Sequence, residues 1–287
     1  MELKYLSETV ANRCMISYKK TFLRTIIAVF LLIGSLPGLS FALEAGDELL
    51  LAARAGDISR IKSALMRGAD VDAVNKAGKT ALMGAVRTKN YRIVDYLLAE
   101  GADVDKVDVR GYSVLMMVCA SGDEMGFDKL TQAGASVNLQ ALDGSTALIN
   151  ASFNGHTELV GGLLARGADP QAVRKNGMGA LHHAAYFGFQ DIVQMLITHG
   201  ADVNGAAEDG MTPLIAAVSN QHVDLSELLL VSGADVKLET KRGKTALANA
   251  QLLDNDDLVG LIEDKVSELE EEAAAAELEQ QGGKKKR

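Results

Sequence analysis

The stretch Gly200-Ala201-Asp202-Val203 recurs along the chain at a fixed interval. Identical or closely similar tetrapeptides give the glycine series Gly68, Gly101, Gly134, Gly167, Gly200 and Gly233. A second series runs in phase with the first and consists of Gly78, Gly111, Gly144, Gly177, Gly210 and Gly243. Every step in both series is 33 residues. Self-similarity at a fixed period of this length predicts a repeat array.

Residues 177–209 show what a single unit predicts. Residues 180–185 are compatible with a short helix, which Gly188 ends. A second helix is expected over residues 190–199, because its apolar residues are spaced as one buried stripe. These residues are Ile192, Val193, Leu196 and Ile197. Gly200 is expected to close this helix in a left-handed conformation. Two helices of about ten residues cannot bury their apolar faces alone, so each unit needs neighbours.

This unit resembles the ankyrin repeat, in which Gly-x-Thr-Pro-Leu begins the first helix and Leu-Leu-x-x-Gly-Ala-Asp-Val ends the second. The resemblance covers residues 43–265 and is closest at residues 210–217, while His182 stands at the family's histidine. Proline starts the first helix only at Pro213, and Gly179 replaces the capping threonine. The predicted fold class is all-α, an ankyrin-repeat solenoid of about seven helix-turn-helix units with β-turn connections.

The phase of the repeats predicts the domain boundaries. We expect an N-terminal capping repeat over residues 43–77, five full repeats over 78–242 and a C-terminal capping repeat over 243–265. The second helix of the last unit is expected to continue into residues 266–287, which form a charged helix and, from Gly282, a flexible basic tail.

Two acidic segments are interpreted as helix N-termini. Asp47 is expected to cap a helix over residues 48–55, which a second helix over 58–66 follows. Residues 254–257 contain three aspartates, which at first sight suggest a calcium site. We expect them instead at the start of the last helix, where the helix dipole favours carboxylates.

Residues 1–42 fall outside the array and are predicted to be a secretory signal peptide. A basic cluster that ends at Arg24 precedes an apolar run over residues 25–36, and Ser40-Phe41-Ala42 supplies the small residues of a cleavage site. Met15 is an alternative start of translation, which would make residues 1–14 an N-terminal extension. The alternative to cleavage is a membrane anchor, because the apolar run approaches the length that spans a bilayer.

Removal of residues 1–42 leaves 24 basic and 36 acidic residues, so the net charge changes from −9 to −12. A protein this acidic is a poor partner for nucleic acid. Cys14 leaves with the leader, and Cys119 takes the position that alanine holds in other units, which favours burial. The expected location is the periplasm, with secretion or inner-membrane anchoring as alternatives.

The sequence contains no pattern typical of catalysis. His182 matches the structural histidine, His156 and His222 stand at the start of second helices, and His199 is expected to be exposed. His183 has no assigned role, and no histidine belongs to a zinc-spaced pair. Phosphate-loop, dinucleotide-binding and Gly-x-Ser-x-Gly motifs are absent. We therefore expect no enzyme activity, cofactor, metal or small-molecule substrate.

The ankyrin resemblance implies a scaffold that binds a protein partner. In the family, the turn tips and the exposed side of the first helices form one concave binding surface. Carried over by position, the resemblance implies these partner-binding residues: Lys76, Lys79, Arg87, Arg110, Tyr112, Leu142, Phe153, Met178, Tyr186, Phe187, Met211, Lys241, Arg242 and Lys244. The alternative function is a secreted effector that binds a host protein.

The middle of this set is rich in aromatic residues and methionine, and both ends are basic. Exposed apolar groups indicate a contact surface, and aromatic residues are enriched among binding hot spots. Tyr112, Met178 and Tyr186 are expected to contact the partner. Phe153 and Phe187 either do the same or only pack between the first helices.

Overall fold

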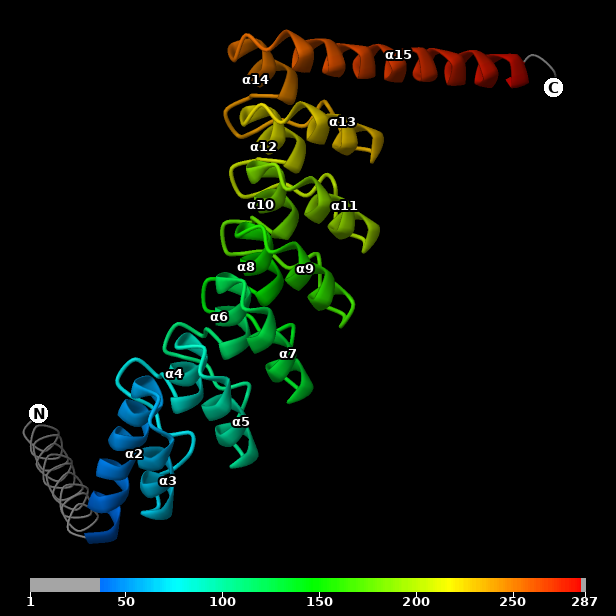
Figure 1. The fold of residues 1–287 in the computed structure, drawn as a ribbon. Helices are drawn as coiled ribbons and strands as arrows, with labels where there is room; N and C mark the ends of the chain where they lie inside the picture. Colours follow the sequence, from blue (N-terminus) through cyan, green and yellow to red (C-terminus); the bar gives the residue numbers. More distant parts are fainter. Residues whose placement is uncertain (1–36, 285–287) are drawn as a thin grey trace, which may run out of the picture. The chain divides into compact units, whose positions relative to one another are not determined.

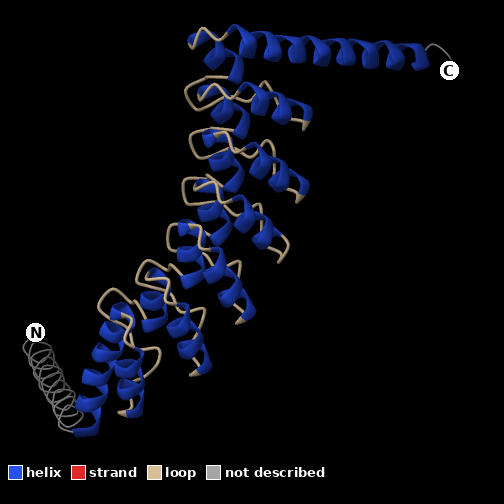
Figure 2. Cartoon of the chain, in the orientation of Figure 1, coloured by secondary structure: helices blue, strands red, loops and turns tan. Residues whose placement is uncertain are grey.

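The computed structural model describes residues 37–284 and divides the chain into two compact units, residues 1–102 and 103–287. Within residues 37–284 the regular structure consists of 14 helices and no strands (Figure 2), together with three isolated β-bridges. The predicted leader and its alternative start at Met15 lie outside the described residues up to position 36. None of the described helices is long and apolar enough to cross a membrane.

The first unit consists of two helix pairs. Its helices are α2 (Pro37–Ala55), α3 (Ile58–Met66), α4 (Ala81–Arg87) and α5 (Tyr91–Ala99). α2 packs against α3 and α4, and α4 packs against α5. Leu49, Ile61, Leu82 and Leu97 are among the side chains buried in this core. The bounds of α3 confirm the helix predicted over residues 58–66.

The prediction that Asp47 caps a helix starting at residue 48 is wrong. The described part of α2 spans Pro37–Ala55, so Asp47 lies inside the helix. Residues 41–45 contain no helix-ending signal, and Gly46 costs only about 1 kcal/mol relative to alanine in a helix. The helix therefore continues through the predicted cleavage position after Ala42.

The second unit stacks five helix pairs (Figure 1). The first helices of the pairs are α6 (Val114–Ser121), α8 (Ala147–Phe153), α10 (Ala180–Phe187), α12 (Pro213–Ser219) and α14 (Ala246–Leu252). The second helices are α7 (Glu124–Gln132), α9 (Thr157–Leu164), α11 (Gln190–Thr198), α13 (Val223–Val231) and α15 (Asp256–Lys284). Each first helix packs against the next first helix and against its own second helix. The apolar stripes of both rows form the core, as the 33-residue period predicts.

Hydroxyl side chains begin most first helices. The Thr146 Oγ1 atom accepts a hydrogen bond from the Ile149 N–H at 3.2 Å, and Ser113, Thr212 and Thr245 act in the same way. Gly179 has no hydroxyl to accept from the third helical residue, and the His182 side chain at that position instead accepts from the Gly179 N–H. Its Nδ1 atom accepts from the Gly179 N–H at 3.2 Å, which leaves Nε2 to donate to the Met211 carbonyl at 3.2 Å. The prediction of a structural role for His182 is therefore confirmed.

The turn tips, residues 109–111, 142–144, 175–177, 208–210 and 241–243, form a backbone ladder. One hydrogen bond joins each tip to the next, from Leu142 N to Arg110 O and from Lys175 N to Asp143 O, both at 2.9 Å. The same bond recurs from Glu208 N to Asn176 O and from Lys241 N to Asp209 O. This constant register holds the side chains of successive tips side by side.

The last helix confirms one expectation and corrects another. Asp256 and Asp257 lie in the first turn of α15, as predicted for carboxylates at a helix N-terminus. The helix continues to Lys284, so Gly282 belongs to it, and the expectation that the flexible tail starts there is wrong. The glutamate- and alanine-rich segment before Gly282 favours helix strongly enough to carry it through these glycines.

Candidate protein-binding surface

The predicted binding residues of the first unit lie at a turn and a helix end. Lys76 is exposed, and Lys79 is half-buried, its backbone N–H donating to the Asn75 side chain at 3.1 Å. Arg87 is exposed at the last position of α4. These three positions are cationic and accessible within their own unit.

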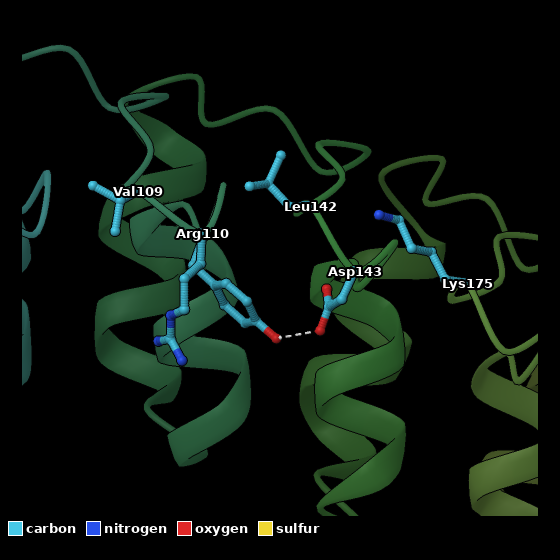
Figure 3. Close-up of a pocket in the computed structure, with 6 residues that line it drawn as sticks. Val109, Arg110, Leu142, Asp143 and Lys175 are labelled. Carbon is cyan, nitrogen blue, oxygen red and sulfur yellow. Dashed lines mark hydrogen bonds between the residues drawn. The ribbon is translucent and has the colours of Figure 1, made fainter.

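In the second unit, three turn tips surround a hollow of about 330 Å³ (Figure 3). Its lining residues are Val109, Arg110, Tyr112, Leu142, Asp143 and Lys175. Three of them, Arg110, Tyr112 and Leu142, were predicted from the sequence. Leu142 is 66% exposed and Val109 is 62% exposed, so apolar groups line the hollow without being covered.

Tyr112 organises the polar groups of this hollow. Its hydroxyl donates to the Asp143 Oδ2 atom at 3.0 Å and lies 3.2 Å from the Ser145 hydroxyl. The guanidinium of Arg110 lies over the Tyr112 ring, 4.9 Å from its centroid. Partial burial acts to raise the pKa of Asp143. The hydrogen bonds from Ser145 and Tyr112 and the charge of Arg174 outweigh it, so this pKa lies below its usual range. Asp143 is therefore ionised and already held by its neighbours.

A second accessible group of side chains, the aromatic cluster, consists of Phe153 on α8 and Tyr186 and Phe187 on α10. Phe187 meets Phe153 edge to face at 5.2 Å between ring centroids and meets Tyr186 at 5.0 Å. The three side chains are 39%, 44% and 41% exposed for Phe153, Tyr186 and Phe187. Phe153 and Phe187 therefore pack together, as one of the two interpretations expected, and they remain accessible, so partner contact stays a prediction.

Arg174 joins this cluster, although it was not predicted from the sequence. Its Nη2 atom donates to the Asn150 Oδ1 atom at 3.2 Å, and its guanidinium lies 5.7 Å from the centroid of the Phe153 ring. At equivalent positions Asn75 and Asp108 close the turn with their side chains, whereas the two adjacent units carry Ala141 and Ala207. An arginine where both adjacent units carry alanine is the sequence signal that could have marked this position.

His183 packs beneath Phe153 and Arg174. It is 6% exposed and meets the Phe153 ring edge to face at 5.1 Å. Burial, followed by the charges of Arg174 and His182, lowers the pKa of His183 to about 4. The imidazole is therefore neutral at pH 7, and its packing accounts for the histidine that the sequence left without a role.

The remaining predicted positions lie apart from the hollow and the aromatic cluster. Met178 and Met211 are half-buried beside their turn tips. Lys241, Arg242 and Lys244 are exposed around the last tip. The structure thus brings the middle of the predicted set together in two groups and leaves a basic group at the C-terminal end of the ladder.

The cysteine and the remaining histidines, whose side chains could in principle take part in chemistry, occupy structural or exposed positions. Cys119 is fully buried, as predicted, and burial raises the pKa of its thiol to about 12. His156 and His222 precede second helices at their N-cap positions, and His199 is exposed. Within residues 37–284, no group of three or more histidine, cysteine, aspartate or glutamate side chains could hold a metal ion.

Stacked 33-residue helix pairs with accessible tips and first helices define a solenoid repeat protein. Family models described as "Ankyrin repeats (3 copies)" match residues 49–141 and 115–207, and one described as "Ankyrin repeats (many copies)" matches residues 196–250. The chain belongs to the ankyrin-repeat family, whose repeats are generally protein–protein interaction modules and typically non-catalytic. No curated protein matches the chain.

Proposed function

We propose that this protein is an exported, non-catalytic scaffold that binds a protein partner through the aromatic cluster of Phe153, Tyr186 and Phe187. The observation that carries the proposal is the exposure of about two-fifths of each of three adjoining aromatic side chains. Contiguous exposed apolar groups mark interaction sites, and tyrosine and arginine are enriched in binding hot spots. Arg174 adds a cation beside the rings.

The repeat itself supplies substitutions that test this surface with little risk to the fold. Equivalent positions in neighbouring units carry Ala120 for Phe153, Ser219 for Tyr186 and Asn220 for Phe187. The variant Phe153→Ala/Tyr186→Ser/Phe187→Asn therefore removes the rings while keeping residues that the array already accommodates.

The experiment is capture of partner proteins from a periplasmic extract by the immobilised protein. We expect the triple variant to capture at least tenfold less partner than the wild type while keeping the helical circular-dichroism signal. The matched control is Met125→Ala/Val231→Ala, which truncates exposed apolar residues on second helices. Wild-type capture by the folded triple variant would contradict the proposal.

The export part of the proposal is motivated by the apolar run over residues 25–36 and by Ser40-Phe41-Ala42. We infer that residues 1–42 are removed and that the protein starting at Leu43 acts in the periplasm. Intact-mass analysis of the fractionated protein tests this. Retention of residues 25–42 in the membrane fraction would favour an anchor, and recovery from the medium or a host cytosol would favour the effector alternative.

A further inference from the structure

The hollow between the turn tips has features of a specific peptide site, and this inference rests on the proposed scaffold function. We propose that it binds an extended segment of the partner that carries one carboxylate side chain at each end and apolar side chains in the middle. The occupant is thus an acidic peptide segment of a protein partner.

The charges of the hollow specify this pattern. Arg110 lies on one tip and Lys175 on the tip two units further along, with Asp143 on the tip between them (Figure 3). Among the described residues, Lys175 makes no ion pair, and Arg110 lies 3.8 Å from the Asp108 carboxylate with its side chain 69% exposed. The two ends of the hollow therefore attract carboxylates, whereas the ionised Asp143 disfavours one in the middle.

The middle of the hollow matches an apolar side chain. Leu142, on the middle tip, is the exposed apolar group there, and the exposed Val109 lies beside Arg110 on the first tip (Figure 3). The Asp143 carboxylate accepts from the Tyr112 hydroxyl and the Ser145 N–H. A basic ligand residue would have to compete with these donors. An aliphatic side chain against Val109 and Leu142 gains burial at no such cost.

The spacing of the tips sets the spacing of the carboxylates. Elements packed side by side lie about 8–10 Å apart, so two steps along the ladder cover about 16–20 Å. An extended chain rises about 3.3 Å per residue, so the second acidic position should lie about five or six positions after the first. The backbone ladder fixes this distance because it holds all three tips in one register.

The test uses a synthetic hexapeptide with glutamate at both ends, leucine at the third and fourth positions and serine elsewhere. Its binding to the purified protein is measured by amide chemical-shift titration. We expect shifts at Val109, Tyr112 and Leu142. Because exposed ion pairs contribute about 0.2–1 kcal/mol each, Arg110→Gln/Lys175→Gln should weaken binding about 2- to 30-fold. A peptide with glutamine at both ends should bind as weakly to the unaltered protein.

The matched control is Arg166→Gln/Lys237→Gln, which removes the same charges from exposed positions outside the hollow. Unchanged affinity in this control supports the inference. Equal weakening in both variants, equal affinity for the glutamine peptide, or shifts confined to the aromatic cluster would each overturn it. These outcomes leave the scaffold proposal in place, because that proposal fails only if the aromatic triple variant captures its partner normally.

Discussion

The turn-tip glycines and the helix-closing glycines of the second unit share a left-handed backbone but differ in their surroundings. Gly144 has φ +83° and Gly134 has φ +87°. A Cβ atom on Gly144 would lie 2.8 Å from the Val173 carbonyl oxygen, which precedes the next tip, whereas one on Gly134 would meet nothing within 4 Å. The turn tips thus require glycine both for its left-handed conformation and for the close approach of the next backbone. The helix-closing positions require it for the conformation alone.

The reason is that the two edges of the stack are joined differently. Backbone hydrogen bonds join successive tips, which must therefore approach closely. At the other edge, side chains bridge the loops. The Asn138 Nδ2 atom donates to the Gly167 carbonyl at 2.9 Å, and its Oδ1 atom accepts from the Asp169 N–H at 2.9 Å. Side-chain bridges keep the backbones apart, so the glycines there are uncrowded.

The largest expected effect is at the tip edge. Gly144→Val adds a left-handed strain of about 1–3 kcal/mol and overpacking of about 1–3 kcal/mol, so we expect the free energy of unfolding to fall by about 2–6 kcal/mol. Urea denaturation measures it. Gly243→Val is the matched control, because Gly243 has φ +69° and a Cβ there would meet nothing closer than 3.9 Å. Equal losses in both variants would show that close approach contributes nothing.

A second perturbation, acidification, acts on His183 beneath the aromatic cluster rather than on a glycine of either edge. His183 has a pKa of about 4 in the folded protein against about 6.5 when unfolded, so the unfolded chain binds more protons between these values. The free energy of unfolding therefore keeps its full value above pH 6.5. It falls by up to about 2–3 kcal/mol as the pH drops toward 4, because protonation of His183 favours the unfolded chain. His183→Met, which copies Met117 at the equivalent position, should show a smaller loss of stability between pH 7 and 4.5. Parallel pH profiles for the variant and the wild type would contradict this.

At the loop edge, Gly134→Val should cost only the conformational strain, about 1–3 kcal/mol, because no neighbouring atom is displaced. Thermal unfolding followed by circular dichroism measures the change. Because units stabilise their nearest neighbours, both sides of the defect should loosen. A melting temperature within a degree of the wild type would contradict the requirement for glycine at this turn.

The sequence was sufficient to predict the helices because two glycine series mark the ends of every unit. It could mark Arg174 as an exception to the repeat, but not the contact that this side chain makes, since a long side chain that reaches Asn150 on the preceding helix pair follows no period. The start of α2 was missed for a related reason. Leu43 to Ala45 are compatible both with a helix that starts after Asp47 and with one that runs through it. Only the observed continuous helix excludes a cap at Asp47.

A third series of left-handed residues was not recognised as a series, although Gly188 was expected to end a helix, because only part of the series is glycine. It precedes the second-helix caps and includes Gly122, Gly155, Gly188, Gln221 and Asp254. A Cβ atom on any of the three glycines would come within 2.6–2.7 Å of a ring from the next unit, His156, Phe189 or His222. The cap that follows Gln221 in the next unit is Asn255, which has no ring. In the second unit the choice of glycine thus depends on a ring 34 positions away, which only the packed structure identifies.

A smaller effect is expected from the side-chain bridges. Asn138→Ala removes two exposed hydrogen bonds and should cost about 1 kcal/mol. Asn204 makes the equivalent pair of bonds, to the Gly233 carbonyl at 3.1 Å and from the Asp235 N–H at 2.8 Å. Asn204→Ala should therefore cost a similar amount in urea denaturation. A loss as large as that of Gly144→Val would mean that the loop edge is coupled as tightly as the tips.

The smallest expected effect is a gain of stability at Gln171, which stands between Asn138 and Asn204 in the same series. Its Nε2 atom donates to the Gly200 carbonyl at 2.6 Å. Each asparagine also accepts a second hydrogen bond, from the N–H of Asp169 or Asp235. Within the described residues, the Gln171 Oε1 atom makes no equivalent bond to the Asp202 N–H. Gln171→Asn shortens the side chain to the length that makes both bonds and orders one fewer rotatable bond. We expect the free energy of unfolding to rise by about 0.5 kcal/mol. Asn138→Gln is the reverse change and should lower it by a similar amount. If both substitutions shift the urea midpoint in the same direction, the length of the bridging side chain does not determine how the loop edge is joined.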